Sequence, residues 1–169
     1  MSLLRHGRAG PALRGAEDRT RVLDARGARE VEEMGTRLRS RGLVPGLILA
    51  SPAARTWASA EIIAQVCGLG SERLRAVDEL YLADPATLWR AATTCDTGVR
   101  HLLICAHNPG ISELAARFAE RPRTHLLPTA GLASAVWEQG EWHELKAHDA
   151  DHCDYDEPRS ERASTRIRL

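Results

Sequence analysis

Short apolar runs alternate with amphipathic stretches along most of this chain, and this alternation constrains the fold more than any other feature. Buried-strand patterns occur at residues 2–4, 47–49, 74–77 and 101–106. The stretches between them space their apolar residues as a helix does, for example over residues 24–41. Strands that alternate with helices predict an α/β fold: a three-layer sandwich with a mostly parallel central sheet and helices on both faces.

Capping residues support two of the predicted helices. Asp24 precedes one apolar-periodic stretch, and Asp84 is followed by Pro85 at a first helical position. The predicted helices cover residues 24–41, 52–67, 85–94 and 109–120.

The C-terminal part of the chain has a different pattern. Residues 127–146 predict two strands around Gln139-Gly140, which is a hairpin signal. The sequence beyond His148 is polar. We therefore expect one folded domain at residues 1–147 and a polar C-terminal tail at residues 148–169.

Length and charge exclude several classes of protein. The chain has 169 residues, with 23 basic and 23 acidic side chains, so its formal net charge is zero. Zero net charge removes the usual electrostatic argument for a nucleic-acid or anionic-membrane partner. No apolar run approaches the roughly 18 residues that a spanning helix needs, and no signal-peptide pattern opens the chain. We expect a cytoplasmic protein with no nucleic-acid or membrane partner.

The cysteines and the basic residues also inform the chemistry. The four cysteines are scattered without a CxxC pair, which indicates reduced thiols rather than a zinc site or a disulfide framework: Cys67, Cys95, Cys105 and Cys153. We expect neither a metal nor a cofactor. Every basic residue except Lys146 is Arg, so an anion site here will be built from guanidinium groups, which suit phosphate geometry.

Reactive side chains follow each apolar run. In open α/β sheets, ligands bind beyond the carboxyl ends of the strands. The residues that follow the four predicted strands are Arg5-His6-Gly7, Ser51 to Arg55, Asp78-Glu79 and His107-Asn108. Because neighbours along a strand point to opposite faces, we expect only one of Asp78 and Glu79 to reach the site, and we favour Glu79. This edge of the sheet therefore predicts an anion site that contains an imidazole.

Six segments of the chain occur in the same order as the corresponding motifs of a known protein family. They are Leu4-Arg5-His6-Gly7-Arg8-Ala9, Asp18 to Gly27, Ser51-Pro52-Ala53-Ala54-Arg55-Thr56, Asp78-Glu79-Leu80-Tyr81, Cys105-Ala106-His107-Asn108-Pro109-Gly110 and Pro128-Thr129-Ala130. In this order and spacing, the chain resembles the histidine phosphatase superfamily, the phosphoglycerate-mutase-like group. The resemblance spans about residues 2–146 and is strongest to the short phosphohistidine phosphatases of the SixA type.

The resemblance implies a role for each matching residue. His6 would attack phosphorus and carry a phosphohistidine intermediate, while Arg5, Arg55 and His107 would hold the phosphoryl oxygens. Glu79 would protonate the leaving group and then activate water. Phosphoryl transfer needs charge around three equatorial oxygens, and two arginines with a cationic imidazole can supply it without magnesium.

Four further residues are candidates for phosphate contact. The backbone of Gly7 is the expected place for a carbonyl that holds the second nitrogen of His6. Arg8 and Arg21 are candidates for the pocket mouth, with solvated loop positions as the alternative. Asn108 is a candidate for phosphate contact or for the helix cap at Pro109.

The sequence thus predicts a metal-independent phosphatase that acts through phosphohistidine. A phosphorylated histidine on a protein is the favoured substrate, and a phosphotransfer protein is a possible partner. The alternatives are a small-molecule phosphomonoesterase on the same residues and a non-catalytic phosphate-binding module.

Overall fold

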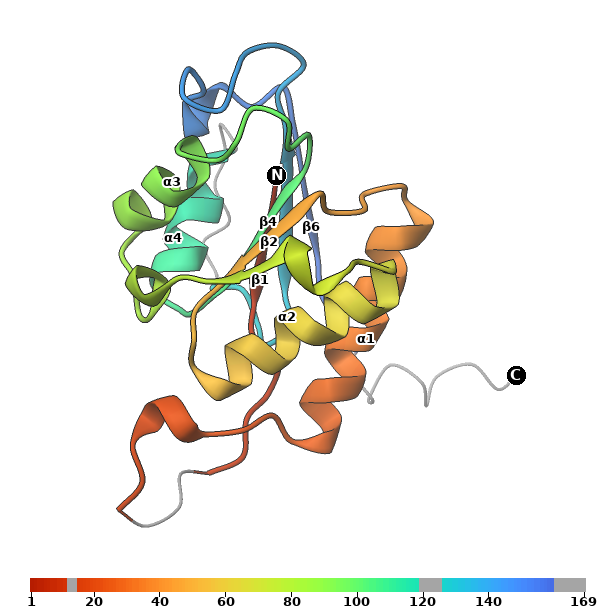
Figure 1. Cartoon of the computed structure of the whole chain (residues 1–169), viewed down its shortest axis with the longest axis vertical. Helices are drawn as coiled ribbons and strands as arrows, with labels where there is room; N and C mark the ends of the chain where they lie inside the picture. Colours follow the sequence, from red (N-terminus) through yellow and green to blue (C-terminus); the bar gives the residue numbers. More distant parts are fainter. Residues whose placement is uncertain (12–14, 119–125, 160–169) are drawn as a thin grey trace, which may run out of the picture.

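A six-stranded sheet forms the centre of the protein in the computed structural model, which describes residues 1–11, 15–118 and 126–159. The strands lie in the order β3-β2-β4-β1-β5-β6. Figure 1 shows the sheet with its flanking helices. They span β1 (Ser2–Arg5), β2 (Leu47–Ala50), β3 (Leu74–Ala76), β4 (Leu102–Ala106), β5 (Leu132–Val136) and β6 (His152–Asp156). Strands β1 to β4 are parallel, β5 runs antiparallel to β1, and β6 runs antiparallel to β5. The predicted mostly parallel sheet is confirmed.

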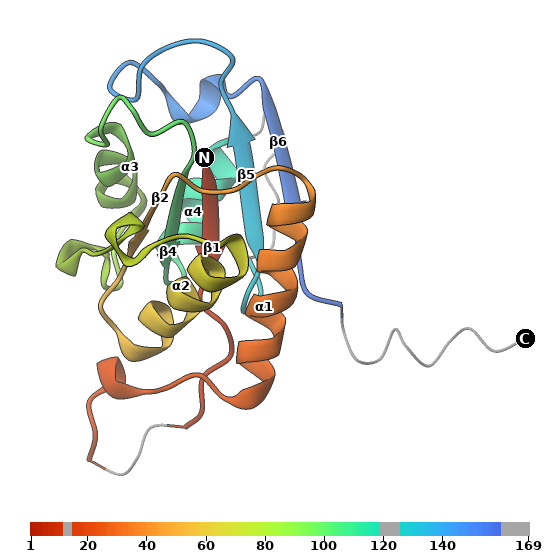
Figure 2. The ribbon, with the colours of Figure 1, turned by 45° about the vertical axis from the view of Figure 1, so that its right-hand side comes forward.

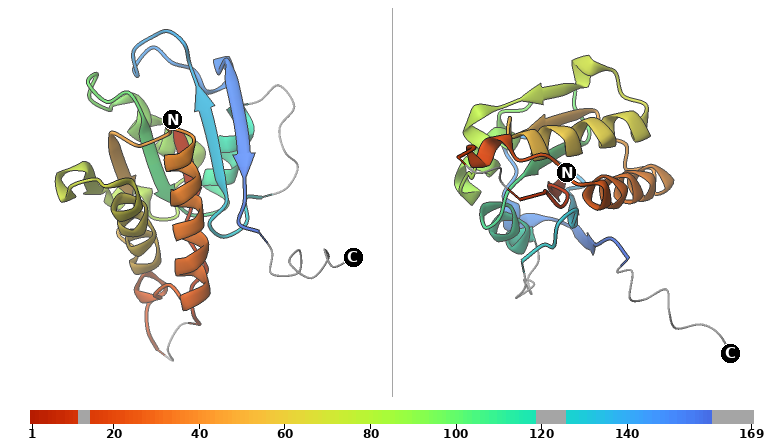
Figure 3. Two further views of the ribbon diagram at one scale, coloured as in Figure 1. Left: turned by 90° about the vertical axis from the view of Figure 1, so that its right-hand side faces the viewer. Right: turned by 90° about the horizontal axis from the view of Figure 1, so that it is seen from below.

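Helices cover both faces of this sheet. Helices α1 (Ala25–Ser40) and α2 (Ala54–Cys67) lie on one face, and α3 (Pro85–Thr93) and α4 (Gly110–Ala115) lie on the other (Figures 2 and 3). The three-layer α/β fold predicted from the alternating pattern is therefore correct. None of the helices in the described ranges is long and apolar enough to cross a membrane.

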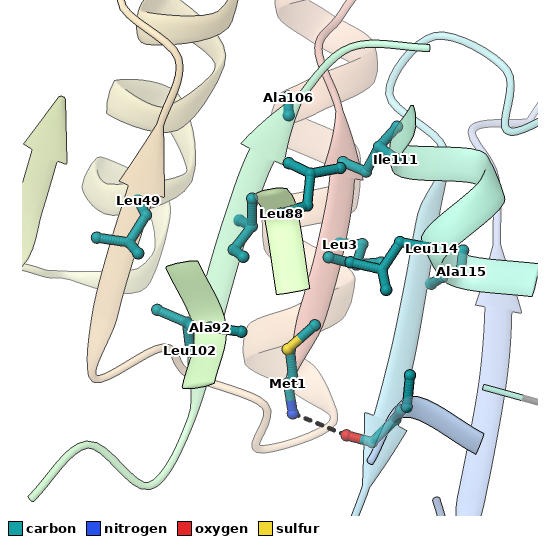
Figure 4. Close-up of a cluster of buried hydrophobic side chains, with 14 of the residues drawn as sticks. Met1, Leu3, Leu49, Leu88, Ala92, Leu102, Ala106, Ile111, Leu114 and Ala115 are labelled. Atoms are coloured by element: carbon teal, nitrogen blue, oxygen red, sulfur yellow. Dashed lines mark hydrogen bonds between the residues drawn. The ribbon is translucent and has the colours of Figure 1, made fainter. Parts of the chain in front are cut away.

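The alternation of side chains along β1 divides the core into two parts. Leu3 faces α3 and α4, where it packs with Leu88 and Leu114 (Figure 4). Its neighbour Leu4 faces α1 and α2, where it packs with Val31. Ser2, Leu3 and Leu4 are all buried, so β1 has no solvent-exposed face, which is typical of a parallel strand at the centre of a sheet.

Both predicted aspartate caps are present. Asp24 accepts a hydrogen bond from the backbone N–H of Gly27 at 2.7 Å, and Asp84 accepts one from Thr87 at 2.8 Å. Each bond satisfies a donor that the first turn of the helix would otherwise leave unpaired.

The end of the chain differs from the prediction. The first strand of the predicted hairpin is β5, but its partner is β6 at His152–Asp156, not a segment near residues 141–146. The expectation of a tail from residue 148 was wrong, because β6 continues the sheet. Arg41, directly after α1, donates to Asp154 at 3.0 Å and to Asp156 at 2.8 Å, so a polar segment can form an edge strand here.

Two other boundaries also differ. The helix predicted at residues 109–120 comprises α4 and a 3-10 turn at Ala116–Phe118. Its last predicted residues, 119–120, lie outside the described ranges, as do residues 160–169 of the predicted tail. Residues Asp78–Leu80 form a 3-10 turn instead of extending β3.

The contact between α1 and the chain after β1 gives a test of this packing. A Cβ at Gly27 would overlap the backbone carbonyl of Arg8, so Gly27→Ala must displace one of the two segments. Glycine to alanine within a helix normally stabilises a protein by up to about 1 kcal/mol. Here we expect the opposite sign, a loss of about 2 kcal/mol of unfolding free energy, measured by urea denaturation.

Gly98→Ala is the matched control, because a Cβ at Gly98 meets nothing within 4 Å. We expect this variant to unfold at the urea concentration of the wild type. Equal stability of the two alanine variants would contradict the close packing of α1 against Arg8.

Candidate active site

The carboxyl ends of three neighbouring strands bring together residues that are far apart in the chain. Arg5 ends β1, with His6 directly after it, Arg55 lies in the first turn of α2 after β2, and His107 follows β4. The ring centroids of His6 and His107 lie 5.1 Å apart. The convergence predicted from the strand ends is therefore present in the fold.

One hydrogen bond sets the protonation of His6. Its Nδ1 lies 2.8 Å from the carbonyl oxygen of Gly7, so Nδ1 carries the proton. The Nε2 atom is left with its lone pair and accepts from the Nε–H of Arg55 at 3.2 Å. Burial, aided by nearby arginines, lowers the pKa of His6 to about 4. Near neutral pH, His6 is therefore an uncharged base and a competent nucleophile.

Only a glycine fits at position 7, beside His6. Its N–H donates to the hydroxyl of Ser59 at 3.0 Å. A Cβ would lie 2.7 Å from the carbonyl oxygen of Gly27 and 2.8 Å from a methyl group of Val31. The close approach of backbones expected at this residue is present, and the carbonyl of Gly7 is thereby fixed beside His6.

The buried guanidinium of Arg55 uses different edges for different partners. Its Nη1 donates to the carbonyl oxygen of Asp18 at 2.6 Å, and its Nη2 donates to the Oδ2 of Asp18 at 2.7 Å. The edge formed by Nε and Nη2 faces Nε2 of His6 and, at 3.4 Å, Nδ1 of His107. Asp18 thus holds the Nη1 and Nη2 end of the Arg55 guanidinium. The edge formed by Nε and Nη2, here called the side edge, faces both imidazoles.

His107 is buried between the strand ends and α2. Its Nε2 lies 2.8 Å from the hydroxyl of Ser51 and 3.2 Å from that of Thr56. Burial, together with the neighbouring His6 and Arg55, lowers the pKa of His107 to about 3. With its pKa lowered in this way, His107 is uncharged near neutral pH in this structure, and the positive charge comes from the arginines; a cationic imidazole in the complex with a phosphoryl group stays a prediction.

Two further arginines contribute to this charge. Arg5 donates from Nη1 to the carbonyl of Leu127 at 2.7 Å, while its buried Nε has no hydrogen-bond partner in the described structure. Arg21 donates to the carbonyl of Gly10 at 3.0 Å. Both arginines lie near enough to lower the pKa of His6. A buried, unpaired N–H beside other cations favours an anionic ligand.

Sequence reasoning assigned no role to Asp18 or Tyr81, although both lie in the matching segments. The hydroxyl of Tyr81 donates to Oδ2 of Asp18 at 3.0 Å, and its ring lies 5.3 Å from that of His107. Hydrogen bonds, first of all from Arg55, lower the pKa of Asp18 to about 2. The pairing of Asp18 with a buried arginine 37 positions further along the chain leaves no signal of its own in the sequence.

Glu79 is not brought to the histidines. It lines a cavity of about 510 Å³ together with Leu49 of β2 and Arg90 of α3, and makes no hydrogen bond to His6 or His107. The argument from strand alternation was wrong here, because Asp78 and Glu79 lie in a 3-10 turn.

Two other candidates have structural partners instead of site contacts. Arg8 is more than half exposed and pairs with the cap residue Asp24 at 2.7 Å. The side chain of Asn108 donates to the carbonyl of Leu127 at 3.0 Å and accepts from Ser112 at 2.5 Å. Asn108 does not cap α4 through its side chain; it ties the end of β4 to the segment that also binds Arg5.

Buried neutral histidines predict a loss of stability in mild acid. Burial is the main cause that lowers the pKa of His6 and of His101 to about 4, and of His107 to about 3. As pH falls below about 6.5, the unfolded chain binds protons that the folded protein does not, so the free energy of unfolding decreases.

Urea denaturation at several pH values between about 7 and 4 measures this slope. His101→Gln removes one of the three groups, and we expect its slope to be shallower than that of the wild type. A free energy of unfolding that stays constant over this range would contradict the assignment of neutral buried imidazoles.

Comparisons with known proteins agree with this geometry. The sequence profile described as the histidine phosphatase superfamily (branch 1) matches residues 1–92, more than half of the chain. A comparison with curated protein sequences finds no match.

Several solved structures share the fold. SixA from Agrobacterium tumefaciens is 30% identical, with a TM-score of 0.68 over 78% of this chain and 86% of that chain. The protein histidine phosphatase SixA complexed with tungstate is 26% identical, with a TM-score of 0.67 over 80% and 88%. SixA from Nakamurella multipartitia is 22% identical, with a TM-score of 0.70 over 94% and 96%, and shows the fold alone. The chain belongs to the histidine phosphatase superfamily (branch 1).

Proposed function

We propose that this chain hydrolyses phosphoryl groups through a phosphohistidine formed on His6, without a metal ion, and that its substrate is a phosphorylated histidine of another protein. The observation that carries the proposal is the unprotonated Nε2 of His6, whose lone pair faces the guanidinium of Arg55. Membership of the superfamily supports the coarser conclusion that the chain is a phosphatase.

The first step is attack of Nε2 of His6 on phosphorus. The phosphoryl group enters between His6 and the side edge of Arg55, and it replaces the contact of 3.2 Å between them. The unpaired Nε of Arg5 supplies another donor for a phosphoryl oxygen. Fixed guanidinium groups stabilise the charge that spreads over the three equatorial oxygens.

The second step releases phosphate. Water attacks the phosphorus, the bond to Nε2 of His6 breaks, and the electron pair returns to that nitrogen. His6 leaves as a neutral imidazole because Nδ1 keeps its proton against the carbonyl of Gly7 throughout. The same hydrogen bond therefore serves attack and release.

The similar structures support the choice of substrate. The protein named a protein histidine phosphatase was solved with tungstate, a tetrahedral oxyanion, and is 26% identical. The present chain covers 88% of it, so the two proteins have similar lengths. A phosphotransfer protein, which carries phosphohistidine on its surface, is the kind of partner that this activity requires.

Replacing the nucleophile gives the direct test. We expect His6→Ala to lower kcat for 4-nitrophenyl phosphate and for a phosphohistidine protein by about 10³-fold or more, since the covalent step is lost. The exposed His143 offers a matched control, and His143→Ala should keep wild-type rates. Activity should persist in EDTA. Undiminished turnover in His6→Ala, or complete loss in EDTA, would reject the mechanism.

The shape of the Arg55 side chain gives a second test. Arg55→Lys keeps the charge but cannot hold Asp18 with one edge and face His6 with the other. We expect kcat/KM for 4-nitrophenyl phosphate to fall by about 10²-fold, the usual cost of one lost oxyanion donor. Arg8→Lys is the control, because Arg8 pairs with Asp24 outside the site. Equal effects of the two substitutions would argue against a specific role of Arg55.

A further inference from the structure

Three exposed apolar side chains lie on loops at the carboxyl edge of the sheet. They are Val22, Leu82 and Leu126, whose exposed fractions are 63%, 55% and 58%. The other two large hydrophobic side chains that are exposed in the described ranges, Val44 and Val136, lie at the opposite edge, before β2 and at the end of β5. Single exposed apolar side chains are common on proteins, but a group of them around one site is typical of a contact surface.

Two of the three side chains lie directly beside residues of the candidate active site. Leu82 follows Tyr81, whose ring centroid lies 5.3 Å from that of His107. Leu126 precedes the residue whose carbonyl oxygen accepts a hydrogen bond from Nη1 of Arg5 at 2.7 Å. These two leucines therefore lie on loops that contact the site.

The third side chain lies on the loop after β1. Val22 follows Arg21, which donates to Oδ1 of Asp18 at 3.2 Å, and Asp18 in turn holds Arg55. The backbone N–H of Gly10 donates to the carbonyl oxygen of Val22 at 3.0 Å, so this part of the loop is fixed by its own hydrogen bond. Three separate loops thus bring apolar side chains to the site, and we call these three side chains the apolar rim.

The backbone at Leu82 supports a role for the rim in binding. Its φ angle is +51°, in the left-handed region that residues with a side chain larger than glycine rarely adopt. The conformation costs free energy, and the exposed side chain gains little from packing in return. Strain at an exposed residue beside a site is typical of a side chain whose contacts form only when a partner binds.

Charged side chains near the rim are paired within the protein. Arg19 donates to Asp78 at 3.0 Å and lies over the ring of Tyr81, with 4.7 Å between the guanidinium carbon and the ring centroid. Arg21 pairs with Asp18 at 3.2 Å. Because these pairs offset each other's charge, the loops have little net charge with which to attract an acidic or a basic surface. The rim therefore suits an apolar surface.

A phosphohistidine on a protein must bring its neighbouring residues to this rim. The histidine side chain is short, and Nε2 of His6 lies among the loops at the edge of the sheet, where His6 is only partly exposed. When the phosphoryl group lies between His6 and Arg55, the residues that flank the phosphohistidine contact these loops. Apolar residues at those positions would bury surface on both partners, which stabilises the complex.

We propose that the apolar rim binds apolar side chains that flank the phosphorylated histidine of a partner protein. This inference rests on the proposed function. The rim then selects among phosphohistidine proteins by the residues around the histidine, and it favours apolar neighbours over acidic ones.

The test uses three synthetic peptides that carry the same reacting group. Each has one phosphohistidine, flanked on both sides by leucines, by serines or by glutamates. We expect kcat/KM for the leucine peptide to exceed that for the serine peptide by about 10-fold, the usual gain from burying part of a large apolar side chain. The glutamate peptide should be no better than the serine peptide. The ratio of leucine to serine peptide should stay constant between about 50 and about 500 mM NaCl, because the contact is apolar.

Two rim variants connect this preference to the rim. Leu82→Asn removes the apolar side chain and supplies a residue that tolerates the left-handed conformation, so the free energy of unfolding should not fall. We expect Leu82→Asn and Leu126→Ser each to lower the ratio of leucine to serine peptide by about 3-fold or more. Val44→Ser is the matched control, because it removes an exposed apolar side chain from the opposite edge, and it should keep the full ratio.

The results separate this inference from the proposed function. Equal kcat/KM values for the leucine and serine peptides, both abolished in His6→Ala, would overturn the inference and leave the phosphohistidine mechanism standing. A preference for the glutamate peptide that salt removes, or a leucine preference that survives the combined Leu82→Asn and Leu126→Ser substitutions, would do the same. Absence of turnover with every peptide, or turnover that His6→Ala does not reduce, would overturn both.

Discussion

The hydrogen bond from Nδ1 of His6 to the carbonyl of Gly7 is the interaction on which the rest of the site depends. It keeps the proton on one nitrogen and leaves the lone pair on the other. The carbonyl stays in place because Gly7 packs against the first turns of α1, in a space that admits no Cβ. The core on the α1 side of the sheet and the chemistry of the nucleophile are thus coupled through a single glycine.

The charge of the site is equally a product of packing. Arg55 is buried, and its end is held by the backbone and side chain of Asp18, so its remaining edge can face only the two imidazoles. Burial keeps both histidines uncharged, which places all the fixed positive charge on arginine. A site with a neutral nucleophile and fixed cations is suited to phosphoryl transfer, because few side chains have to reorganise when the anionic phosphoryl group binds.

Patterns in the sequence predicted much of the fold, and the errors have physical causes. The alternation of apolar runs and amphipathic stretches identified four parallel strands and their helices, and two aspartates marked helix starts correctly. Strand β6 was missed because its residues are polar: it is held by pairing with β5 and by ion pairs with Arg41, directly after α1, which local hydrophobicity does not record. Only one of Asp78 and Glu79, preferably Glu79, was expected in the site because a 3-10 turn was interpreted as a continuing strand.

The sequence by itself determined which side chains follow the strands, because hydrophobic periodicity sets where each strand ends. That was enough to bring Arg5, Arg55 and the two histidines to one edge of the sheet. Only the tertiary structure decided the charge states and the partners, since burial and hydrogen bonds arise from segments distant in the chain. Asp18 pairs with Arg55, and Glu79 lines another cavity. Both placements result from contacts that no local sequence pattern encodes.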